Sequence, residues 1–240
     1  MRFCFCCAVL AMLSFASARA DVDDAQLREI FDRAGRYIDD PDGPSGEIRY
    51  AIHLTGGDTN RVVSLMKQLV TEGTLRRGVV KFYVSEIGRY GTTNDLAFLY
   101  HQVPMTNLSE VATEAILNLE GLTTNSVATV VSSLPSEASR SWDVMCARCL
   151  LLEASEKYPS STPARMMILS NAVDYASRLT NYVDILDGSI TRVDPSYRMS
   201  RRRLGVLRSV QALGVNEWQT NFVMRAIREL EAYPEAELPE

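Results

Sequence analysis

The sequence predicts an all-α protein. From Asp24 onward, apolar residues recur at the three- and four-residue spacing that places them on one face of a helix, and few runs alternate as a strand would. Glycine or proline interrupts this pattern at short intervals, which favours many short helices over a few long ones. The chain has 240 residues, and a core of that size needs no disulfide bonds for stability.

The first twenty residues predict an export signal rather than part of the fold. Arg2 gives a positive start, residues 3–13 form an apolar run too short to span a bilayer, and Ala18 and Ala20 form the small-x-small pattern of a signal peptidase site. We therefore expect a periplasmic or secreted protein that begins at Asp21 and has no transmembrane anchor after cleavage. A retained membrane anchor is the alternative interpretation.

Charge and cysteine content argue against two classes of protein. Removing residues 1–20 takes Arg2 and Arg19 from the 25 basic residues and nothing from the 30 acidic ones, so the mature chain is acidic. Nucleic-acid binding is therefore not expected, because proteins that bind phosphate backbones display a positive field. Three of the five cysteines leave with the signal, so a disulfide framework is not expected either.

The N-terminal half is expected to form a series of short helices. A stripe from Leu27 to Ile38 marks the first, and prolines and glycines at residues 41–46 end it. Residues 47–55 fit either a strand or a short helix, and we choose the helix. Three more helices are expected at residues 59–72, 75–90 and 94–103, ending at Gly73, Gly91 and Pro104.

Three further helices are expected before the next proline-rich segment. Asn107 with Glu110 resembles a capping box, and Gly121 is suited to the turn that ends this helix. Residues 125–134 form the next helix, which Pro135 stops. A longer helix at residues 137–157 is expected to place on one face Trp142, Met145, Cys146, Cys149 and Leu150. The six helices from residue 59 onward fall into three antiparallel pairs.

These pairs recur at roughly thirty residues, a period typical of stacked helical hairpins. Residues 112–119 resemble the second helix of a HEAT repeat, as do residues 87–90. The resemblance covers residues 58–158 and implies a short α-solenoid of the HEAT-like or armadillo type. The sequence departs from such repeats at Asn107 and Ser109, where a proline or aspartate and an arginine are usual. Another all-α arrangement, such as a helical bundle, is the alternative.

The best internal boundary lies at residues 158–163. Two prolines and three hydroxyl residues cannot continue a helix there, but they can cap the next one, with Pro163 in its first turn. We therefore expect a helical-repeat domain at residues 21–158 and a C-terminal helical region at residues 159–240 that packs on it.

Three helices are expected in the C-terminal region. The first is long and ends near Gly188, and Asp194 caps the second, which ends at Gly214. Asn216 caps the third, and the tail at residues 235–240 is expected to fray. The inward face of the third helix is expected to contain Phe222, Val223, Ala226, Ile227, Leu230 and Tyr233.

Cys146 and Cys149 form the one recognisable thiol motif of the mature chain. A thioredoxin-like site needs a βαβ context, and a c-type haem site needs a histidine directly after Cys149. A zinc site needs two further ligands, but His53 and His101 stand alone in distant segments. We expect both thiols to pack as small apolar side chains between helices, and no metal or cofactor is expected. A disulfide and a metal or redox role are the alternatives.

Five arginines, all expected on one helix, are the sharpest charge feature of this acidic chain. Guanidinium groups bind carboxylates and phosphates, so this face is suited to an acidic protein, an anionic glycan or a lipid headgroup. The alternative is a solvated face that pairs with the acidic C-terminal helix through Glu229 or Glu231. The five candidate binding residues are Arg198, Arg201, Arg202, Arg203 and Arg208.

The sequence pattern favours an exported, non-enzymatic interaction or scaffold protein. Its residues form packing stripes rather than clusters of titratable groups, so no catalytic residue is identified, and we expect a protein partner in the cell envelope or outside the cell. One alternative is an exported, all-helical hydrolase that acts on polysaccharide through paired carboxylates. Another is thiol or metal binding through Cys146 and Cys149.

Overall fold

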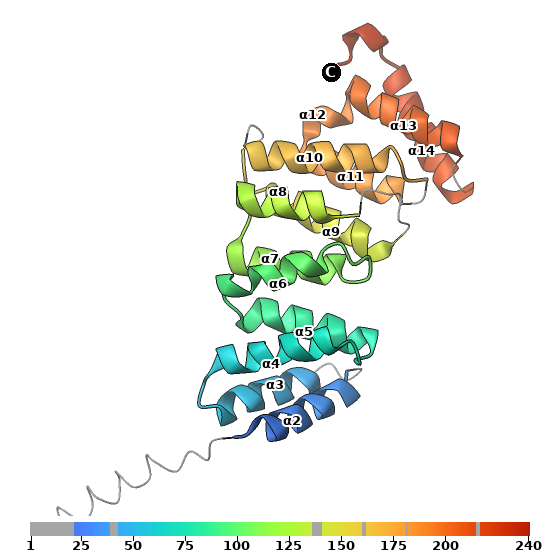
Figure 1. Cartoon of the computed structure of the whole chain (residues 1–240). Helices are drawn as coiled ribbons and strands as arrows, with labels where there is room; N and C mark the ends of the chain where they lie inside the picture. Colours follow the sequence, from blue (N-terminus) through green and yellow to red (C-terminus); the bar gives the residue numbers. More distant parts are fainter. Residues whose placement is uncertain (1–21, 39–42, 136–140, 160–161, 181, 215–216) are drawn as a thin grey trace, which may run out of the picture. The chain divides into compact units, whose positions relative to one another are not determined.

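The computed structural model describes residues 22–38, 43–135, 141–159, 162–180, 182–214 and 217–240 (Figure 1). These residues are helical and contain no strand, which confirms the predicted all-α class. The leader at residues 1–20 lies outside them, so the export signal stays a prediction. The helices are α2 (Asp24–Arg36), α3 (Gly43–Leu54), α4 (Thr59–Glu72), α5 (Arg77–Tyr90), η1 (Thr93–Asp95), α6 (Leu96–Gln102), α7 (Ser109–Glu120), α8 (Thr124–Ser133), α9 (Trp142–Ser155), α10 (Pro163–Ala176), α11 (Val183–Val193), α12 (Pro195–Arg198), α13 (Arg201–Leu213), α14 (Glu217–Glu231) and η2 (Glu235–Glu237).

The chain divides into two compact units, one up to Glu86 and one from Ile87, so the division falls within α5. The proline-rich segment at residues 158–163 links α9 to α10, which pack on each other inside the second unit. Among the described helices of both units, none is long and apolar enough to cross a membrane.

In the first unit, α2 and α3 pack along each other, which confirms the choice of a helix over a strand for residues 47–55. A capping box between Asp23 and Gln26 starts α2. The Tyr83 ring from α5 meets Phe31 edge-on, and its hydroxyl donates a 2.8 Å hydrogen bond to the Phe31 carbonyl. This aromatic pair and its hydrogen bond therefore join α2 to α5 within the core of the first unit.

Helix α4 has the bounds that the sequence predicts. Asp58 caps its first turn by accepting a 3.0 Å hydrogen bond from the Arg61 backbone N–H. Gly73 ends it in the left-handed conformation, with φ of 70°, which glycine adopts without steric cost. Both signals are local, so this helix could be placed from its own residues.

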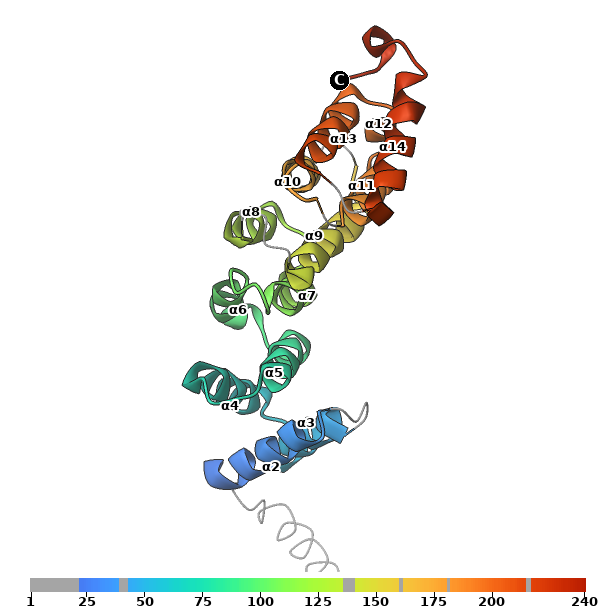
Figure 2. The same cartoon turned by 90° about the vertical axis from the view of Figure 1, so that its right-hand side faces the viewer.

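The second unit contains two rows of helices. Helix α6 packs on α8, α7 on α9, α8 on α10, and α9 on α11, so each helix contacts the one two positions further along. Figure 2 shows α6, α8 and α10 in one row and α7, α9 and α11 in the other. Gly88 lets α5 approach α7 closely, because a Cβ atom there would lie 2.5 Å from the Ala115 Cα atom.

Two of the long helices expected in the C-terminal region are each divided. The predicted helix ending near Gly188 is wrong, because α10 ends at Ala176 and α11 begins at Val183, with Tyr182 between them at a φ of 66°. The predicted helix from Pro195 is also divided, since α12 ends after one turn. Asp194 does cap α12, and Ser200 caps α13.

The tail is docked rather than frayed, contrary to the expectation. The Arg201 backbone N–H donates a 2.8 Å hydrogen bond to the Pro239 carbonyl, and Arg201 Nε donates a 3.0 Å bond to the Leu238 carbonyl. The Leu238 side chain is buried, which supplies the apolar contact. Tyr233, expected to face inward, is exposed beyond the end of α14, and the predicted cap Asn216 lies outside the described residues.

Several helix starts also differ from the sequence prediction. The predicted cap at Asn107 would start α7 at Leu108, but the helix begins at Ser109. Leu108 occupies the cap position and makes no side-chain hydrogen bond there. Helix α8 is capped by Thr123, whose hydroxyl accepts from the Ser126 backbone N–H. Helix α9 begins at Trp142 with Ser141 at its cap position, and residues 137–140, expected to belong to this helix, lie outside the described part of the chain.

Candidate functional site

The five predicted arginines do not share one helix, so that prediction is wrong. Arg198 ends α12, and the other four lie on α13. The turn between the helices arises because Ser200 caps α13 through a 3.1 Å hydrogen bond from the Arg203 backbone N–H. This turn points Arg203 into the core while Arg198 stays exposed.

Arg203 forms a buried ion pair with Asp187 of α11. Its Nε donates hydrogen bonds of 3.0 and 3.2 Å to the two carboxylate oxygens, and its Nη2 donates one of 2.9 Å. Its Nη1 also donates a 2.9 Å bond to the Arg198 carbonyl. Asp187 is 0% exposed and Arg203 is 5% exposed, so the pair is enclosed and its polar atoms are satisfied within the chain.

The electrostatics of this pair follow from burial. Burial raises the pKa of Asp187, and the hydrogen bonds and charge of Arg203 oppose that rise. The Tyr197 ring of α12 is buried beside the pair, and burial together with the Asp187 carboxylate raises the pKa of Tyr197 well above its usual range. The tyrosine is therefore uncharged at neutral pH.

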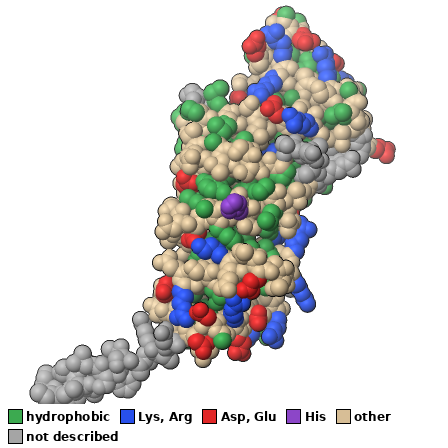
Figure 3. Space-filling model, in the orientation of Figure 1, with side chains coloured by type: hydrophobic (Ala, Val, Ile, Leu, Met, Phe, Trp, Pro, Cys, Tyr) green, Lys and Arg blue, Asp and Glu red, His purple; other side chains and the backbone are tan. Residues whose placement is uncertain are grey.

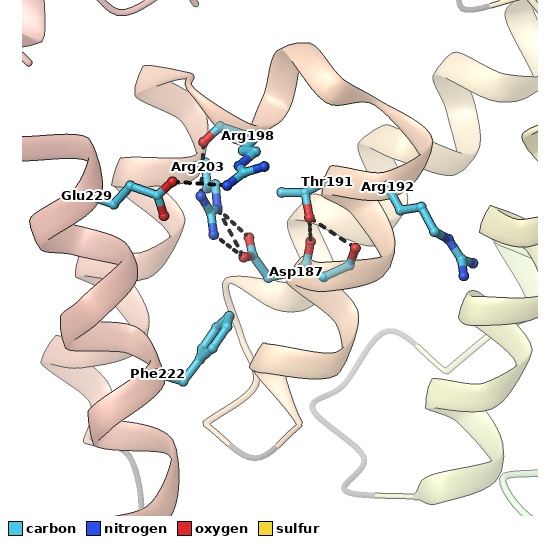
Figure 4. Close-up of a pocket in the computed structure, with 8 residues that line it drawn as sticks. Asp187, Thr191, Arg192, Arg198, Arg203, Phe222 and Glu229 are labelled. Carbon is cyan, nitrogen blue, oxygen red and sulfur yellow. Dashed lines mark hydrogen bonds and ion pairs between the residues drawn. The ribbon is translucent and has the colours of Figure 1, made fainter.

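A groove of about 340 Å³ opens beside the pair (Figure 4). Arg198 Nη2 lies 3.3 Å from Glu229 of α14, and Arg192 lies within ion-pair distance of Glu153 and Glu156 of α9. Phe222 of α14 projects toward the groove, whereas Arg192 extends away from the buried pair (Figure 4). The lining residues are Asp187, Gly188, Thr191, Arg192, Arg198, Arg203, Phe222 and Glu229.

The remaining predicted arginines lie outside this groove. Arg208 pairs with Glu231 at 3.0 Å and with Glu235 at 3.2 Å, and Arg201 holds the tail. Arg202 is exposed. Figure 3 shows that basic and acidic side chains intermix over the C-terminal helices, with no single basic patch on the face drawn. The alternative that the sequence offered, pairing with the acidic C-terminal helix, describes Arg198 and Arg208 correctly.

Cys146 and Cys149 are both free thiols and both half-buried. Burial raises the pKa of Cys146 to about 11 and also raises the pKa of Cys149, so both are protonated thiols at neutral pH rather than nucleophilic thiolates. Ser189 Oγ lies 3.8 Å from Cys149 Sγ. Among the described residues, no group of three or more histidine, cysteine or acidic side chains is placed to hold a metal ion.

The buried face of α9 differs from the predicted one. Trp142, expected on that face, is exposed and meets the Tyr182 ring edge-on at 5.4 Å. Met145 is buried as expected, but Leu150 is only partly buried. The buried residues of α9 are Asp143, Val144, Met145, Ala147, Arg148, Leu151, Leu152 and Ser155.

Sequence reasoning did not identify several of the groove residues, among them Asp187, Arg192 and Phe222, as parts of a site. Asp187 and Arg203 are 16 residues apart on different helices, and no spacing rule connects them. Comparisons of the chain with protein-family models, curated proteins and solved structures found no match. Function is therefore inferred from the groove itself.

Proposed function

We propose that this chain is an exported, non-enzymatic binding protein whose C-terminal groove takes an acidic segment of a protein partner. The observation that carries the proposal is the composition of the groove. Three arginines and two carboxylates line it, and only one arginine, Arg203, is locked in a buried pair. The other two lie at the surface in exposed ion pairs, Arg198 with Glu229 and Arg192 with Glu153 and Glu156.

The ion pair between Arg198 and Glu229 is suited to exchange. The two side chains are 64% and 42% exposed, so water screens their attraction and a partner carboxylate competes on nearly equal terms. Phe222 adds a half-buried apolar surface on the same groove. A segment with one acidic and one apolar side chain therefore complements the groove in both charge and polarity.

The arrangement of the two groove carboxylates favours binding over hydrolysis. A glycosidase needs one carboxylic acid and one carboxylate that both reach the substrate. Asp187 is enclosed and bonded to Arg203, and Glu229 is paired with Arg198. Neither residue has the environment that this chemistry needs.

The proposal includes two further features, namely a HEAT-like stack of helical hairpins and a cleaved export signal. The alternate packing of helices α6 to α11 supports stacked hairpins of the HEAT-like kind, which present long surfaces to partners. Val22 is buried, and its carbonyl accepts a 2.6 Å hydrogen bond from Arg61, so the fold holds the chain two residues after the predicted cleavage site at Ala20.

The test is crosslinking in the native cells with the tagged, signal-bearing protein, followed by mass spectrometry of the envelope and medium fractions. We compare wild type with Arg198→Glu, which reverses the charge in the groove. Arg208→Glu is the matched control, because Arg208 is also exposed and also pairs with α14, but lies outside the groove.

A near-stoichiometric protein partner that is lost in Arg198→Glu and kept in Arg208→Glu supports the proposal. Equal loss in both variants contradicts it, because the effect then follows overall charge rather than the groove. Recovery without any partner also contradicts it. The N-terminal residue of the recovered protein tests export, with Asp21 expected.

A further inference from the structure

Arg148 on α9 is a second buried arginine, on a helix face whose other buried residues are mostly apolar. It is 3% exposed and lies one turn from Val144 and Leu151, both fully or almost fully buried. Its Nη2 donates a 3.2 Å hydrogen bond to the Pro135 carbonyl, and its Cζ lies 3.7 Å from the centre of the Tyr175 ring. One backbone oxygen and one aromatic face hold this cation.

Within the part of the chain that the structure describes, no carboxylate pairs with the Arg148 guanidinium. Its Nε and Nη1 atoms are enclosed and have no hydrogen-bond acceptor among these residues. Burial lowers the pKa of Arg148 to about 10, and the Tyr175 side chain opposes this shift, so the group is still protonated at neutral pH. An enclosed cation with unsatisfied donors is costly, and an anion placed beside it offsets that cost.

A cavity of about 130 Å³ borders the guanidinium. At about 30 Å³ for each water molecule, this volume corresponds to roughly four waters, enough for a carboxylate or phosphate group. The other lining residues recur at three- and four-residue spacing along α10 and just beyond its end. This spacing places their side chains on one face of the helix. The cavity is lined by Arg148, Asn171, Asp174, Tyr175 and Arg178.

The charge of this cavity favours an anion. Arg148 and Arg178 outnumber the single lining carboxylate, Asp174, and Asn171 adds an amide donor. Asp174 and Arg178 are both exposed, so water screens their charges more strongly than it screens the charge of the buried Arg148. The positive charge is therefore the stronger influence inside the cavity.

We propose that this cavity is an oxyanion site in which Arg148 and Arg178 hold the carboxylate or phosphate group of a small ligand. Because Nε and Nη1 are enclosed, direct hydrogen bonds to them require a small rotation of Arg148 toward the cavity. The site lies between α9 and α10 and stands on different residues from the groove, so it does not depend on the proposed function.

The test is thermal unfolding of the purified full chain at neutral pH, with sodium phosphate or sodium acetate replacing sodium chloride at constant ionic strength. We expect a saturable rise in Tm for wild type with at least one of the two anions, because a ligand that binds only the folded state stabilises it. The anion with the lower midpoint concentration identifies the preferred group.

Two variants locate the effect. Arg148→Met is expected to abolish the anion-dependent rise. Arg165→Met is the matched control, because Arg165 is also buried, on α10, and bonded to the Tyr158 carbonyl, yet does not line the cavity. This control should keep the full rise.

If Arg148→Met fails to fold, Asp174→Asn keeps the proposal testable. Removing the exposed carboxylate from the cavity wall should lower the midpoint anion concentration several-fold. The proposal is overturned if neither phosphate nor acetate raises the Tm of wild type beyond chloride. It is also overturned if Arg148→Met and Asp174→Asn, when folded, both respond as wild type does.

Discussion

Arg203 and Arg148 are both buried arginines of the second unit, but the fold surrounds them differently. Arg203 donates to both carboxylate oxygens of Asp187 and to a backbone carbonyl. Arg148 has one backbone acceptor and an aromatic ring, and two of its nitrogens have no acceptor among the described residues. Asp187 supplies the anion for Arg203, whereas no described carboxylate does so for Arg148.

This difference teaches that a missing internal acceptor, rather than burial or clustering along the sequence, distinguishes Arg148 as a candidate anion site. Arg203 belongs to a run of arginines and is structurally satisfied, whereas Arg148 stands between two cysteines and is not. A guanidinium enclosed with its own acid is part of the core. A guanidinium enclosed without one is a place where an external anion can gain free energy by binding.

The largest effect is expected from breaking the Arg203 pair. Asp187→Leu should lower the free energy of unfolding by about 3–5 kcal/mol, because it leaves an enclosed cation without its partner. Chemical denaturation measures this loss. The double variant Asp187→Leu with Arg203→Met should be more stable than either single variant. A single-variant loss below about 1 kcal/mol would show that the pair is not enclosed in solution.

A smaller change in the free energy of unfolding is expected when the pH is raised through the pKa of Arg148. The folded-state pKa of Arg148 is lowered to about 10 from an ordinary value of 12.5, so between these values the unfolded chain binds more protons. Raising the pH through about 10 should therefore stabilise wild type relative to Arg148→Met, by about 1 kcal/mol near pH 11. Denaturation of both proteins across this range measures the difference. A constant difference contradicts the claim that Arg148 is enclosed as a cation.

Replacing Arg148 at neutral pH should cost far less than breaking the Arg203 pair. Arg148→Met loses one hydrogen bond to Pro135 and the stacking on Tyr175, but it also removes two unsatisfied donors. We expect a change of less than about 1 kcal/mol in the free energy of unfolding, in either direction. A loss as large as that of Asp187→Leu would mean that Arg148 already has an internal partner.

The smallest effect on stability is expected at the surface arginines. Arg198→Glu and Arg208→Glu should each shift Tm by less than about 3 °C, because their ion pairs are exposed and screened. Differential scanning calorimetry measures both. A large Tm loss for Arg198→Glu alone would make the groove pair a structural element, and its use for exchange with a partner would then be untenable.

The fold could be predicted where signals are local, and it could not where they are tertiary. Helix α4 was predictable because Asp58 and Gly73 mark both of its ends. The break between α10 and α11 was not, because apolar residues continue in helical register through it and the left-handed conformation of Tyr182 has no sequence signal. The docked tail depends on backbone bonds to Arg201, which no local pattern reveals.

The candidate sites were less predictable than the fold. The sequence prediction placed Trp142 on the buried face of α9 together with the two cysteines. In the structure, the residue that shares the core face with Val144, Leu151 and Leu152 is Arg148. The sequence did contain a signal for this, because Arg148 lies at helical spacing from these apolar residues. A basic residue within an apolar stripe indicates a buried charge. The acid that holds Arg203 could not be chosen among many acidic residues without the tertiary structure.

The most direct test of the contrast between the two arginines follows both in one sample. Side-chain Nε–Hε resonances of Arg148 and Arg203 are recorded by NMR while phosphate, and separately acetate, replaces chloride at constant ionic strength. We predict that with at least one anion the Arg148 resonance shifts and saturates while the Arg203 resonance stays in place, because Asp187 already occupies its donors. Two unchanged resonances, or two that move together, would contradict the account.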